Sequence, residues 1–312
     1  RTNASIGIAL NEDTTENGEE LLRHADIAMY RAKEKGRARF EIFDLEMHSR
    51  TVMMMRTETE LRRAIGTDEI LLHYQPVVDL EKRVVAGFEA LVRWNQPGRG
   101  MISPAQFIPL AEETGLIGAL GRQVLYMACR QNREWKDQFG EPTVIAVNLS
   151  VYQLQREDVV SLVQDVLKET GLPPSTLKLE LTEGAFLDYQ KGGLEALDEL
   201  KAMGIGLSID DFGTGYSSFS YLGKLPIETI KLDRSFIMGL PQDKDHQAIS
   251  KAILAMAQAM DLKVVAEGIE HSGQLRFLYE HGCRFAQGYL FSRPVGVEQA
   301  VDLLFSSVDV RI

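Results

Sequence analysis

Short apolar runs rich in β-branched residues recur along most of the chain and alternate with longer stretches of helical periodicity. The strand candidates lie at residues 69–78, 84–92, 143–149, 177–182, 205–210, 227–232, 262–267 and 283–287. The clearest helical stretches lie at residues 104–139, 151–170, 190–203, 243–260 and 271–281. Strands that alternate with helices in this way predict an α/β fold, a (β/α)8 barrel of the TIM type.

The first two strand candidates are joined by a short connection, Asp79–Arg83. A parallel crossover needs a dozen or more residues, so these two strands are expected to form a hairpin. One of the two should therefore run antiparallel in the barrel.

The N-terminal residues have a pattern of their own. Residues 3–10 read as a strand, residues 19–35 as an amphipathic helix that ends at Gly36, and residues 40–43 as a closing strand. These residues are too few for an independent hydrophobic core. We expect this small α/β fragment to pack against the segment that follows or to remain partly ordered.

A helical run at 45–66 follows this fragment. It is either a helix packed on the barrel or on its neighbour, or a connecting or dimer-forming helix that passes signals. The expected organisation is a fragment at 1–43, a connecting helix at 44–66, a barrel at 67–307 and a tail at 308–312.

The composition narrows the class of protein. The 312 residues carry a formal net charge of −11, which argues against a general binder of polymeric nucleic acid or anionic membranes. The cysteines, Cys129 and Cys283, show no metal-ligand spacing, so we expect free thiols in a reducing compartment, the cytoplasm. The six histidines are scattered and are expected at the surface. No apolar run approaches a membrane span of ~20 residues, although a start at Arg1 suggests a fragment, which leaves room for a membrane-anchored parent.

Charged and amide side chains stand at or just past the ends of the apolar runs. They are Glu89, Asn148, Glu180, Asp210, Asp211, Lys231 and Glu267. In a barrel the carboxyl ends of the strands meet on one face, where catalytic groups from several strands come together. Carboxylates are costly to gather unless cations lie between them. Because the candidate ligand atoms are oxygens, the pattern favours Mg²⁺ or Mn²⁺ over Zn²⁺.

Asp210 and Asp211 begin the densest of these signals, DDFGTG. Adjacent strand residues point to opposite faces, so the two aspartates can share a site only where the strand gives way to a loop. The glycines that follow permit a tight turn. A helix N-cap followed by a turn is the alternative interpretation. Glu180 lies between Leu179 and Leu181 and should face into the barrel, where an unpaired charge is rarely buried.

Several motifs recur in a fixed order along the chain. They are YQP at 74–76, EALVRW at 89–94, VNLS at 147–150, ELTE at 180–183, DDFGTGYSS at 210–218, IKLD at 230–233, VAEG at 265–268 and QGY at 287–289. Together, over about residues 58–306, they resemble the EAL domain family of cyclic di-GMP phosphodiesterases. The resemblance implies a metal-dependent enzyme that hydrolyses cyclic di-GMP to linear pGpG in bacterial second-messenger signalling.

The resemblance also implies a role for each matching residue. One divalent metal ion would have as ligands Glu89, Asn148, Glu180 and Asp210. A second ion would be held by Asp211 and Glu267, with Asp210 as the bridge, and both ions would be Mg²⁺ or Mn²⁺. Lys231 would orient the attacking water or help to deprotonate it. Glu267 is the candidate general base, and a metal-ligand role is the competing view.

Other matching positions would hold the substrate or the loop beside the site. Guanines and phosphates would be held by Gln75, Leu91, Arg93, Glu270, Gln287 and Pro294. Arg93 suits a phosphate because a guanidinium can bind it through two parallel hydrogen bonds. Glu183 resembles a glutamate that anchors the loop after Asp211. The same loop is a dimer-contact region in the family, so a homodimer is expected.

The N-terminal residues resemble a second family. SIGIA at 5–9 and ADIAMYRAK at 25–33 are similar to the last part of a GGDEF (diguanylate cyclase) domain. The residues that name that domain, and its nucleotide-binding half, are absent from the chain. The chain should therefore make no cyclic di-GMP from GTP.

Two other functions compete with hydrolysis of cyclic di-GMP. Many relatives keep the pocket but lose metal ligands and act as receptors, whereas the acidic set of this chain has no substitution. A phosphodiesterase for another diester, such as a glycerophosphodiester, is disfavoured because Gln75, Arg93 and Gln287 match the dinucleotide family.

Overall fold

The computed structural model describes residues 4–10, 17–140, 143–184, 194–214 and 222–305. By their internal contacts the residues form two compact units, Arg1–Arg63 and Ala64–Ile312. The finer division into fragment, connecting helix, barrel and tail stays a prediction.

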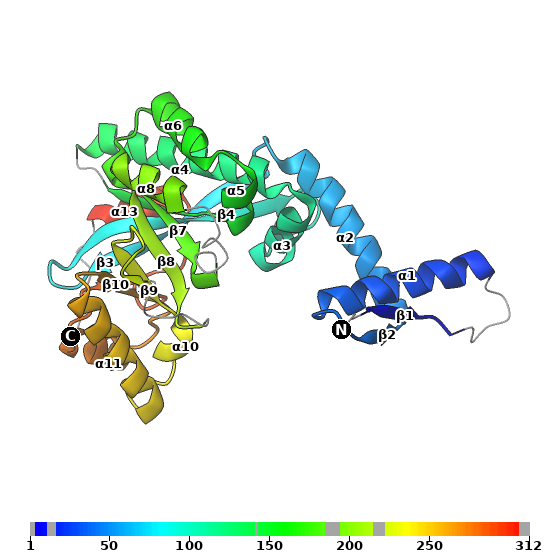
Figure 1. Cartoon of the computed structure of the whole chain (residues 1–312). Coiled ribbons are helices and arrows are strands. Elements are labelled where there is room, and N and C mark those ends of the chain that lie inside the picture. The colour runs from blue at the N-terminus through cyan, green and yellow to red at the C-terminus, as the bar shows by residue number, and fades with distance from the viewer. Residues whose placement is uncertain (1–3, 11–16, 141–142, 185–193, 215–221, 306–312) are drawn as a thin grey trace. The chain divides into compact units, whose positions relative to one another are not determined.

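The smaller unit is built on a two-stranded parallel sheet. Strand β1 (Ile6–Ile8) pairs with β2 (Phe40–Ile42), and helix α1 (Gly18–Glu34) connects them (Figure 1). Asn17 caps α1 by accepting a hydrogen bond from the Glu20 N–H, 2.9 Å away. The unit also contains most of helix α2 (Leu45–Ala64), as the helical periodicity predicted.

One histidine of the smaller unit departs from the expectation of a surface position. His24 is buried, because its ring stacks on Phe43 with the ring centroids 3.8 Å apart. The scattered sequence positions gave no sign of this contact.

The larger unit is a closed barrel of eight strands. In chain order they are β3 (Ile70–Asp79), β4 (Val84–Gln96), β6 (Val144–Asn148), β7 (Leu177–Thr182), β8 (Gly206–Phe212), β9 (Thr229–Leu232), β10 (Lys263–Ala266) and β11 (Phe285–Ala286). The order round the barrel is β3-β11-β10-β9-β8-β7-β6-β4, and the pairing of β3 with β4 closes it. β3 is antiparallel to both of its neighbours, while the other pairs run parallel, so the predicted hairpin is confirmed.

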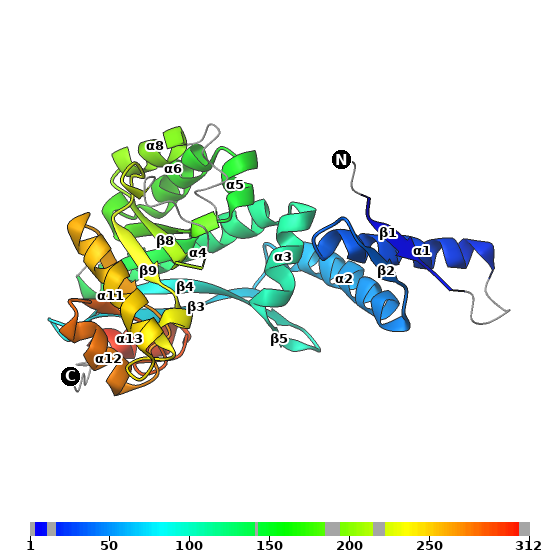
Figure 2. The same cartoon turned by 60° about the horizontal axis from the view of Figure 1, so that its bottom comes forward.

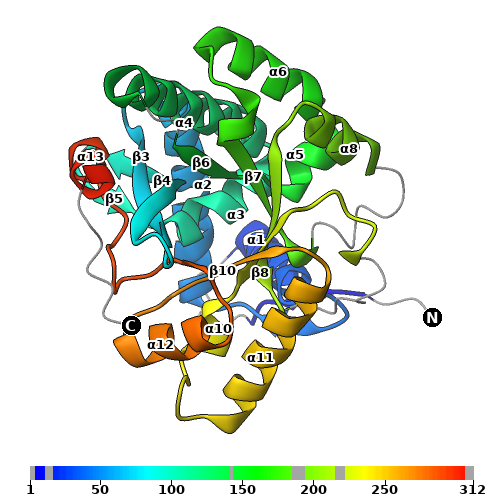
Figure 3. The ribbon, with the colours of Figure 1, turned by 90° about the vertical axis from the view of Figure 1, so that its left-hand side faces the viewer.

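Helices surround the strands (Figure 3). They are α3 (Pro104–Thr114), α4 (Ile117–Phe139), α5 (Val151–Arg156), α6 (Val159–Thr170), α8 (Leu194–Ala202), α10 (Arg234–Ile237), α11 (Lys244–Ala259), α12 (Ser272–Glu280) and α13 (Val297–Phe305), with a 3₁₀ turn at Pro174–Thr176. A short strand, β5 (Gly100–Ile102), extends the far end of β4 as a second hairpin (Figure 2). β5, α10 and α13 were not predicted.

The long helices expected at 104–139 and 151–170 are each two helices. Gly115 ends α3 with φ of 74°, a left-handed conformation that favours glycine and stops the helix. Glu157 adopts an extended conformation after α5, and Asp158 then caps α6 by accepting from the Ser161 N–H. The spacing of apolar residues alone does not reveal such breaks, because the helical pattern continues after each of them.

The core lies between the strands and the helices. Trp135 of α4 packs against Tyr74 and Phe88 of the β3–β4 hairpin, with ring centroids 4.9 and 5.2 Å apart. β4 and β6 approach so closely that a Cβ at Gly87 would lie 2.5 Å from the Val144 carbonyl oxygen. Inside the barrel the strands place polar side chains, and these form the candidate site.

Candidate functional site

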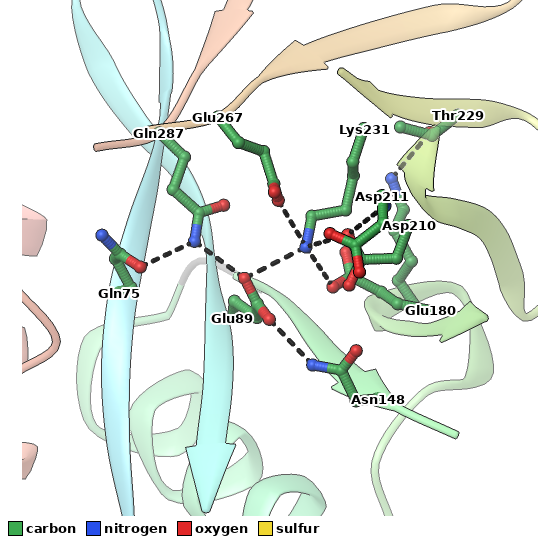
Figure 4. A network of polar contacts seen from close by, with 11 residues as sticks. Gln75, Glu89, Asn148, Glu180, Asp210, Asp211, Thr229, Lys231, Glu267 and Gln287 are labelled. Carbon is green, nitrogen blue, oxygen red and sulfur yellow. Dashed lines mark hydrogen bonds and ion pairs between the residues drawn. The ribbon is translucent and has the colours of Figure 1, made fainter. Parts of the chain in front are cut away.

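The ammonium group of Lys231 lies at the centre of the candidate site (Figure 4). Its Nζ is 2.7 Å from Glu180 Oε2, 2.7 Å from Glu267 Oε1, 3.0 Å from Asp210 Oδ1 and 3.1 Å from Glu89 Oε2. These residues come from five different strands or strand ends, which the barrel brings to one place. The strand-end pattern therefore predicted which side chains meet.

Strand alternation explains how the charged side chains reach the interior. Lys231 and Glu180 are each flanked by buried leucines or isoleucines that face the helices, so the charged residue faces inward. Glu89 was predicted at the end of a strand. In the structure it lies inside β4, which continues for seven more residues to Gln96. The pairing of β4 with β3 and β5 prolongs the strand past the site.

Asp210 and Asp211 share the site through an irregularity in β8. The register between β8 and β9 shifts between Ile209 and Phe212, and Asp211 has φ of 53°. The Asp211 N–H donates to Asp210 Oδ1 over 3.1 Å. The two neighbours therefore do not alternate as strand residues would. A loop was predicted at this point, whereas in the structure the irregularity lies within strand β8.

Two groups of carboxylates have the geometry to hold a cation. Glu89, Glu180 and Asp210 form one group, and Asp210, Asp211 and Glu267 form the other, each with ligand oxygens within 4.8 Å of one another. Asp210 belongs to both groups. Asn148 adjoins the first group, since its Nδ2 donates to Glu89 Oε1 over 2.8 Å.

The charges of this cluster are not balanced by the protein. In the described part of the chain, Lys231 is the single cation within ion-pair distance of Glu89, Glu180, Asp210 and Glu267, and Asp211 adds a fifth carboxylate beside them. Burial raises the pKa of Glu180 to about 8, because the nearby Glu89 and Asp210 carboxylates add to the desolvation and Lys231 only partly offsets it. Burial also raises the pKa of Glu267 well above its usual value.

Glu89 and Lys231 remain charged in this cluster. Burial opposes the charge of Glu89, yet Lys231, Gln287 and Asn148 outweigh it and lower the pKa of the carboxyl. Burial likewise opposes the charge of Lys231, but the surrounding carboxylates raise the pKa of its ammonium well above the usual value. A further cation would neutralise the carboxylates that Lys231 leaves uncompensated.

Two glutamines connect the acidic cluster to the neighbouring strands. Gln287 Nε2 donates to Glu89 Oε2 over 2.8 Å and to Gln75 Oε1 over 3.1 Å. Gln75 Nε2 in turn donates to the Ser292 carbonyl over 3.3 Å. Both glutamines were predicted from the sequence as substrate contacts. The hydrogen bonds of Gln287 to Glu89 and to Gln75 were not predicted.

The other candidate substrate contacts lie farther from the acidic cluster. Arg93 and Leu91 follow Glu89 on β4, and burial lowers the pKa of the half-buried Arg93. Pro294 precedes Val295, which pairs with Tyr74 of β3 through two backbone hydrogen bonds of 2.7 and 3.0 Å. The remaining candidate lies beyond β10.

Glu270 lies in the segment between β10 and α12. Its carboxylate forms an ion pair of 2.9 Å with Arg234 of α10. Its backbone N–H donates to Gln274 Oε1 over 2.9 Å. Arg234 had no sequence signal, because α10 itself was not predicted.

Glu183 lies just past β7 and is buried. Its Oε2 accepts a hydrogen bond of 2.7 Å from the N–H of Gly213, two residues after Asp211. The loop that it was expected to anchor continues through 215–221, which lie outside the described residues.

Comparison with known proteins identifies the family. The EAL domain family matches residues 58–294, which is more than half of the chain. The chain belongs to the EAL domain family. The diguanylate cyclase GGDEF domain matches residues 1–39, so the EAL domain is preceded by a GGDEF fragment.

Relatives of this EAL domain include curated signalling proteins. The bifunctional diguanylate cyclase/cyclic di-GMP phosphodiesterase MucR of Pseudomonas aeruginosa is 44% identical over 299 residues, which cover 96% of this chain and 44% of MucR. The cyclic di-GMP phosphodiesterase PdeR of Escherichia coli is 39% identical over 294 residues, covering 94% of this chain and 44% of PdeR. The chain thus spans less than half the length of these relatives.

Solved EAL domains share its fold. The PaMucR phosphodiesterase, solved as a c-di-GMP complex, superposes with a TM-score of 0.75 at 45% identity and covers 78% of this chain and 99% of that one. The FimX EAL domain from Pseudomonas aeruginosa, bound to c-di-GMP, has a TM-score of 0.72 at 27% identity, covering 80% of this chain and 99% of that one. The predicted TIM barrel is confirmed.

Polar residues beneath the acidic cluster of the EAL domain were not predicted from the sequence. Lys178 precedes Glu180 by two residues on β7 and therefore faces the same way. Its Nζ donates to Thr229 Oγ1 over 2.9 Å, and burial lowers the pKa of its ammonium. Strand alternation was the signal that could have found it.

Proposed function

We propose that this EAL domain hydrolyses cyclic di-GMP to linear pGpG. The observation that carries the proposal is the complete set of inward carboxylates that converge round Lys231, with Asn148 and Gln287 bonded to Glu89. The named relatives support the substrate, since MucR and PdeR are described as cyclic di-GMP phosphodiesterases.

The residues fit divalent metal ions. Glu89, Asn148, Glu180 and Asp210 would hold one ion. Asp211 and Glu267, together with Asp210, would hold a second. Hard oxygen ligands suit Mg²⁺ or Mn²⁺, and the uncompensated carboxylates supply the charge that binds them. When bound, such ions lower the pKa of water and stabilise negative charge at a phosphoryl group.

The residues of the chain would position the attacking water and move its proton. Lys231 would donate a hydrogen bond to the water in place of one of its carboxylate contacts, which orients a lone pair of the water toward phosphorus. Glu267, whose Oε1 lies 2.7 Å from Lys231 Nζ, would accept the proton from the water that Lys231 orients. Asp211 lies beside Glu267 and would share the second metal ion with it. A purely ligating role for Glu267 is the alternative.

Binding of the substrate would involve residues at the rim of the barrel. Arg93 would hold a phosphate through its guanidinium, and Leu91 and Pro294 would offer apolar contact to guanine. Gln75, Gln287 and Glu270 carry hydrogen-bonding groups for base edges. Since Gln287 also bonds to Glu89, substrate binding and the metal centre would be connected by one side chain.

A receptor function is the alternative to catalysis. The assay is incubation of the chain with cyclic di-GMP and Mg²⁺ or Mn²⁺, with products separated by liquid chromatography and binding measured in parallel by calorimetry. Formation of pGpG that stops on chelation supports the proposal. Tight binding of cyclic di-GMP without pGpG would support the receptor instead.

The cellular location and the oligomeric state of the enzyme are also proposals. We place it in the cytoplasm, which is supported by the free, buried thiols of Cys129 and Cys283. None of the helices in the described ranges combines the length and apolar character of a membrane span. The expected homodimer involves the loop at 212–222, of which residues 215–221 lie outside the described residues, and it is proposed from the family resemblance.

A further inference from the structure

A cavity of about 1140 Å³ lies at the amino-terminal end of the barrel, opposite the strand ends that carry the candidate active site. Its lining includes the first residues of β4, β6 and β10 and the last residues of α4 and α13. Its inner end reaches Glu180 and Lys231. The cavity is therefore separate from the substrate contacts at the rim but adjoins the catalytic network from below.

The charges that line the cavity are mostly positive, although the chain as a whole is acidic. The cations are Lys82, Lys178, Lys231, Lys263 and Arg284, and the anions are Asp79, Glu180 and Asp261. Arg284 is paired with Asp79 at 2.8 Å, and Lys231 is surrounded by the catalytic carboxylates. The cationic excess of the cavity is therefore carried by the other lysines.

Of Lys82, Lys178 and Lys263, Lys178 is the least exposed. Its Nζ has three N–H groups, and one donates to Thr229 Oγ1 at 2.9 Å. Its nearest carboxylate, Glu228, lies 3.7 Å away and is shared with Lys201 at 3.5 Å. Glu228 therefore forms an ion pair with Lys178 that is longer than a hydrogen bond, and the partly buried ammonium keeps N–H groups for a ligand.

Apolar side chains make up part of the same cavity wall. Trp135 is 1% exposed and is one of the lining residues. Val77, Phe88 and Phe285 line the cavity as well.

We propose that this cavity is a second ligand site, which takes a small organic anion with a flat apolar body, such as an aromatic carboxylate. The carboxylate accepts hydrogen bonds from the Lys178 ammonium, and the apolar body lies against the aromatic and aliphatic walls. The volume leaves room for such a ligand, because it lies just above the range of about 300–1,000 Å³ that is common for small-molecule pockets.

The site is linked to the catalytic network through charge. Lys178 interacts electrostatically with Glu180, a candidate metal ligand. Its positive charge opposes the binding of a divalent cation nearby, and a bound anion offsets that charge. Anion binding therefore tightens metal binding, and by linkage the metal tightens anion binding equally.

Calorimetry with three probes of one shape tests the ligand class. The full chain is titrated with naphthalene-2-carboxylate, 2-naphthalenemethanol and 2-naphthylmethylamine, which differ only in the charge of the head group. We expect the carboxylate to bind at least about tenfold more tightly than the alcohol, and the amine not to bind. Equal affinity for all three, or no binding of the carboxylate, would overturn the proposal.

Variants locate the site. Lys178→Met should weaken binding of the carboxylate probe by about tenfold or more, whereas Lys168→Met on the exposed face of α6 should not change it. Lys178→Gln removes the charge and keeps a polar side chain. It should weaken the probe by about threefold or more, and it serves if Lys178→Met does not fold. Unchanged binding in the folded variants would contradict the assignment.

The linkage is measured by titrating Mg²⁺ calorimetrically with and without saturating naphthalene-2-carboxylate. We expect the Mg²⁺ affinity to rise about fivefold with the probe. An unchanged Mg²⁺ affinity would overturn the linkage to the catalytic network.

Discussion

At the scale of single residues, the site depends on an imbalance of charge. Four carboxylates contact the Lys231 ammonium and a fifth, that of Asp211, lies beside them, so Lys231 leaves negative charge uncompensated. The identity of these residues could be predicted from their positions at strand ends. The contacts could not, because the direction of each side chain depends on packing and on the irregularity at Asp211.

The substitution Glu267→Gln removes the ability to accept a proton but keeps the size of the side chain. The amide keeps the size of the side chain but cannot accept a proton, so kcat should fall by about 10²–10⁴-fold while the fold is retained. Steady-state kinetics and a thermal melt measure both. Near-normal turnover in the variant would remove Glu267 from the mechanism.

Glu183→Ala tests a residue that acts through the backbone. Its carboxylate holds the Gly213 N–H at 2.7 Å, so its loss should loosen the segment after Asp211, lower kcat by about tenfold and weaken Mg²⁺ binding. Higher Mg²⁺ should restore part of the activity. The matched variant Glu180→Ala should lose activity at every Mg²⁺ concentration. Wild-type kinetics in Glu183→Ala would refute the anchoring role.

The pKa shifts predict how stability changes with pH. Because the pKa of Glu180 is raised to about 8, the folded state binds more protons than the unfolded state from about pH 4.5 to 8. Without divalent ions, stability should therefore fall as pH rises through this window, and Asp211 and Glu267, whose pKa values are also raised, act in the same direction. The lowered pKa of His73 acts in the opposite direction below its usual value of 6.5.

Metal binding should reverse this dependence. Mg²⁺ binds the deprotonated carboxylates, so the Tm gained on adding Mg²⁺ should be larger at pH 8 than at pH 5.5. Thermal melts at the two pH values with Mg²⁺ and with a chelator measure this gain. An equal gain at both pH values would contradict the raised pKa of Glu180.

At the scale of elements, the strands were predictable and the interruptions were not. Each of the eight barrel strands lies within two residues of its predicted bounds, except β4, which runs on to Gln96 because β5 pairs with its far end. Apolar alternation marks a strand clearly because one face is buried. The break at Gly115 and the short helix α10 leave no comparable periodicity, since each spans about one turn or less.

A substitution at Gly213 tests whether the irregular end of β8 is needed for Mg²⁺ binding. It has φ of 97°, and a Cβ there would lie 2.7 Å from the Phe236 ring. Gly213→Ala should therefore lower the Tm and also weaken Mg²⁺ binding at Asp210 and Asp211. Gly98→Ala is the matched control, because Gly98 has φ of 84° but no neighbour within 4 Å. It should cost about 1 kcal/mol of stability and leave Mg²⁺ affinity unchanged. Equal Mg²⁺ affinity in both variants would contradict the account.

At the scale of the whole molecule, the chain combines an EAL domain with a GGDEF fragment. The resemblance in sequence motifs predicted both, because several motifs occurred in order over most of the chain. The barrel could be predicted from the alternation of strands and helices. The cavity at its amino-terminal end could not, since it arises from residues of many elements that are far apart in sequence.

The central claim is that the EAL domain uses water to open a phosphodiester of cyclic di-GMP. The most direct test is turnover in ¹⁸O-labelled water with Mg²⁺, followed by mass spectrometry of the product. We predict pGpG that carries one ¹⁸O atom on its terminal phosphate, and no product in excess chelator. Intact cyclic di-GMP after incubation with Mg²⁺ or Mn²⁺, or pGpG without the label, would contradict the account.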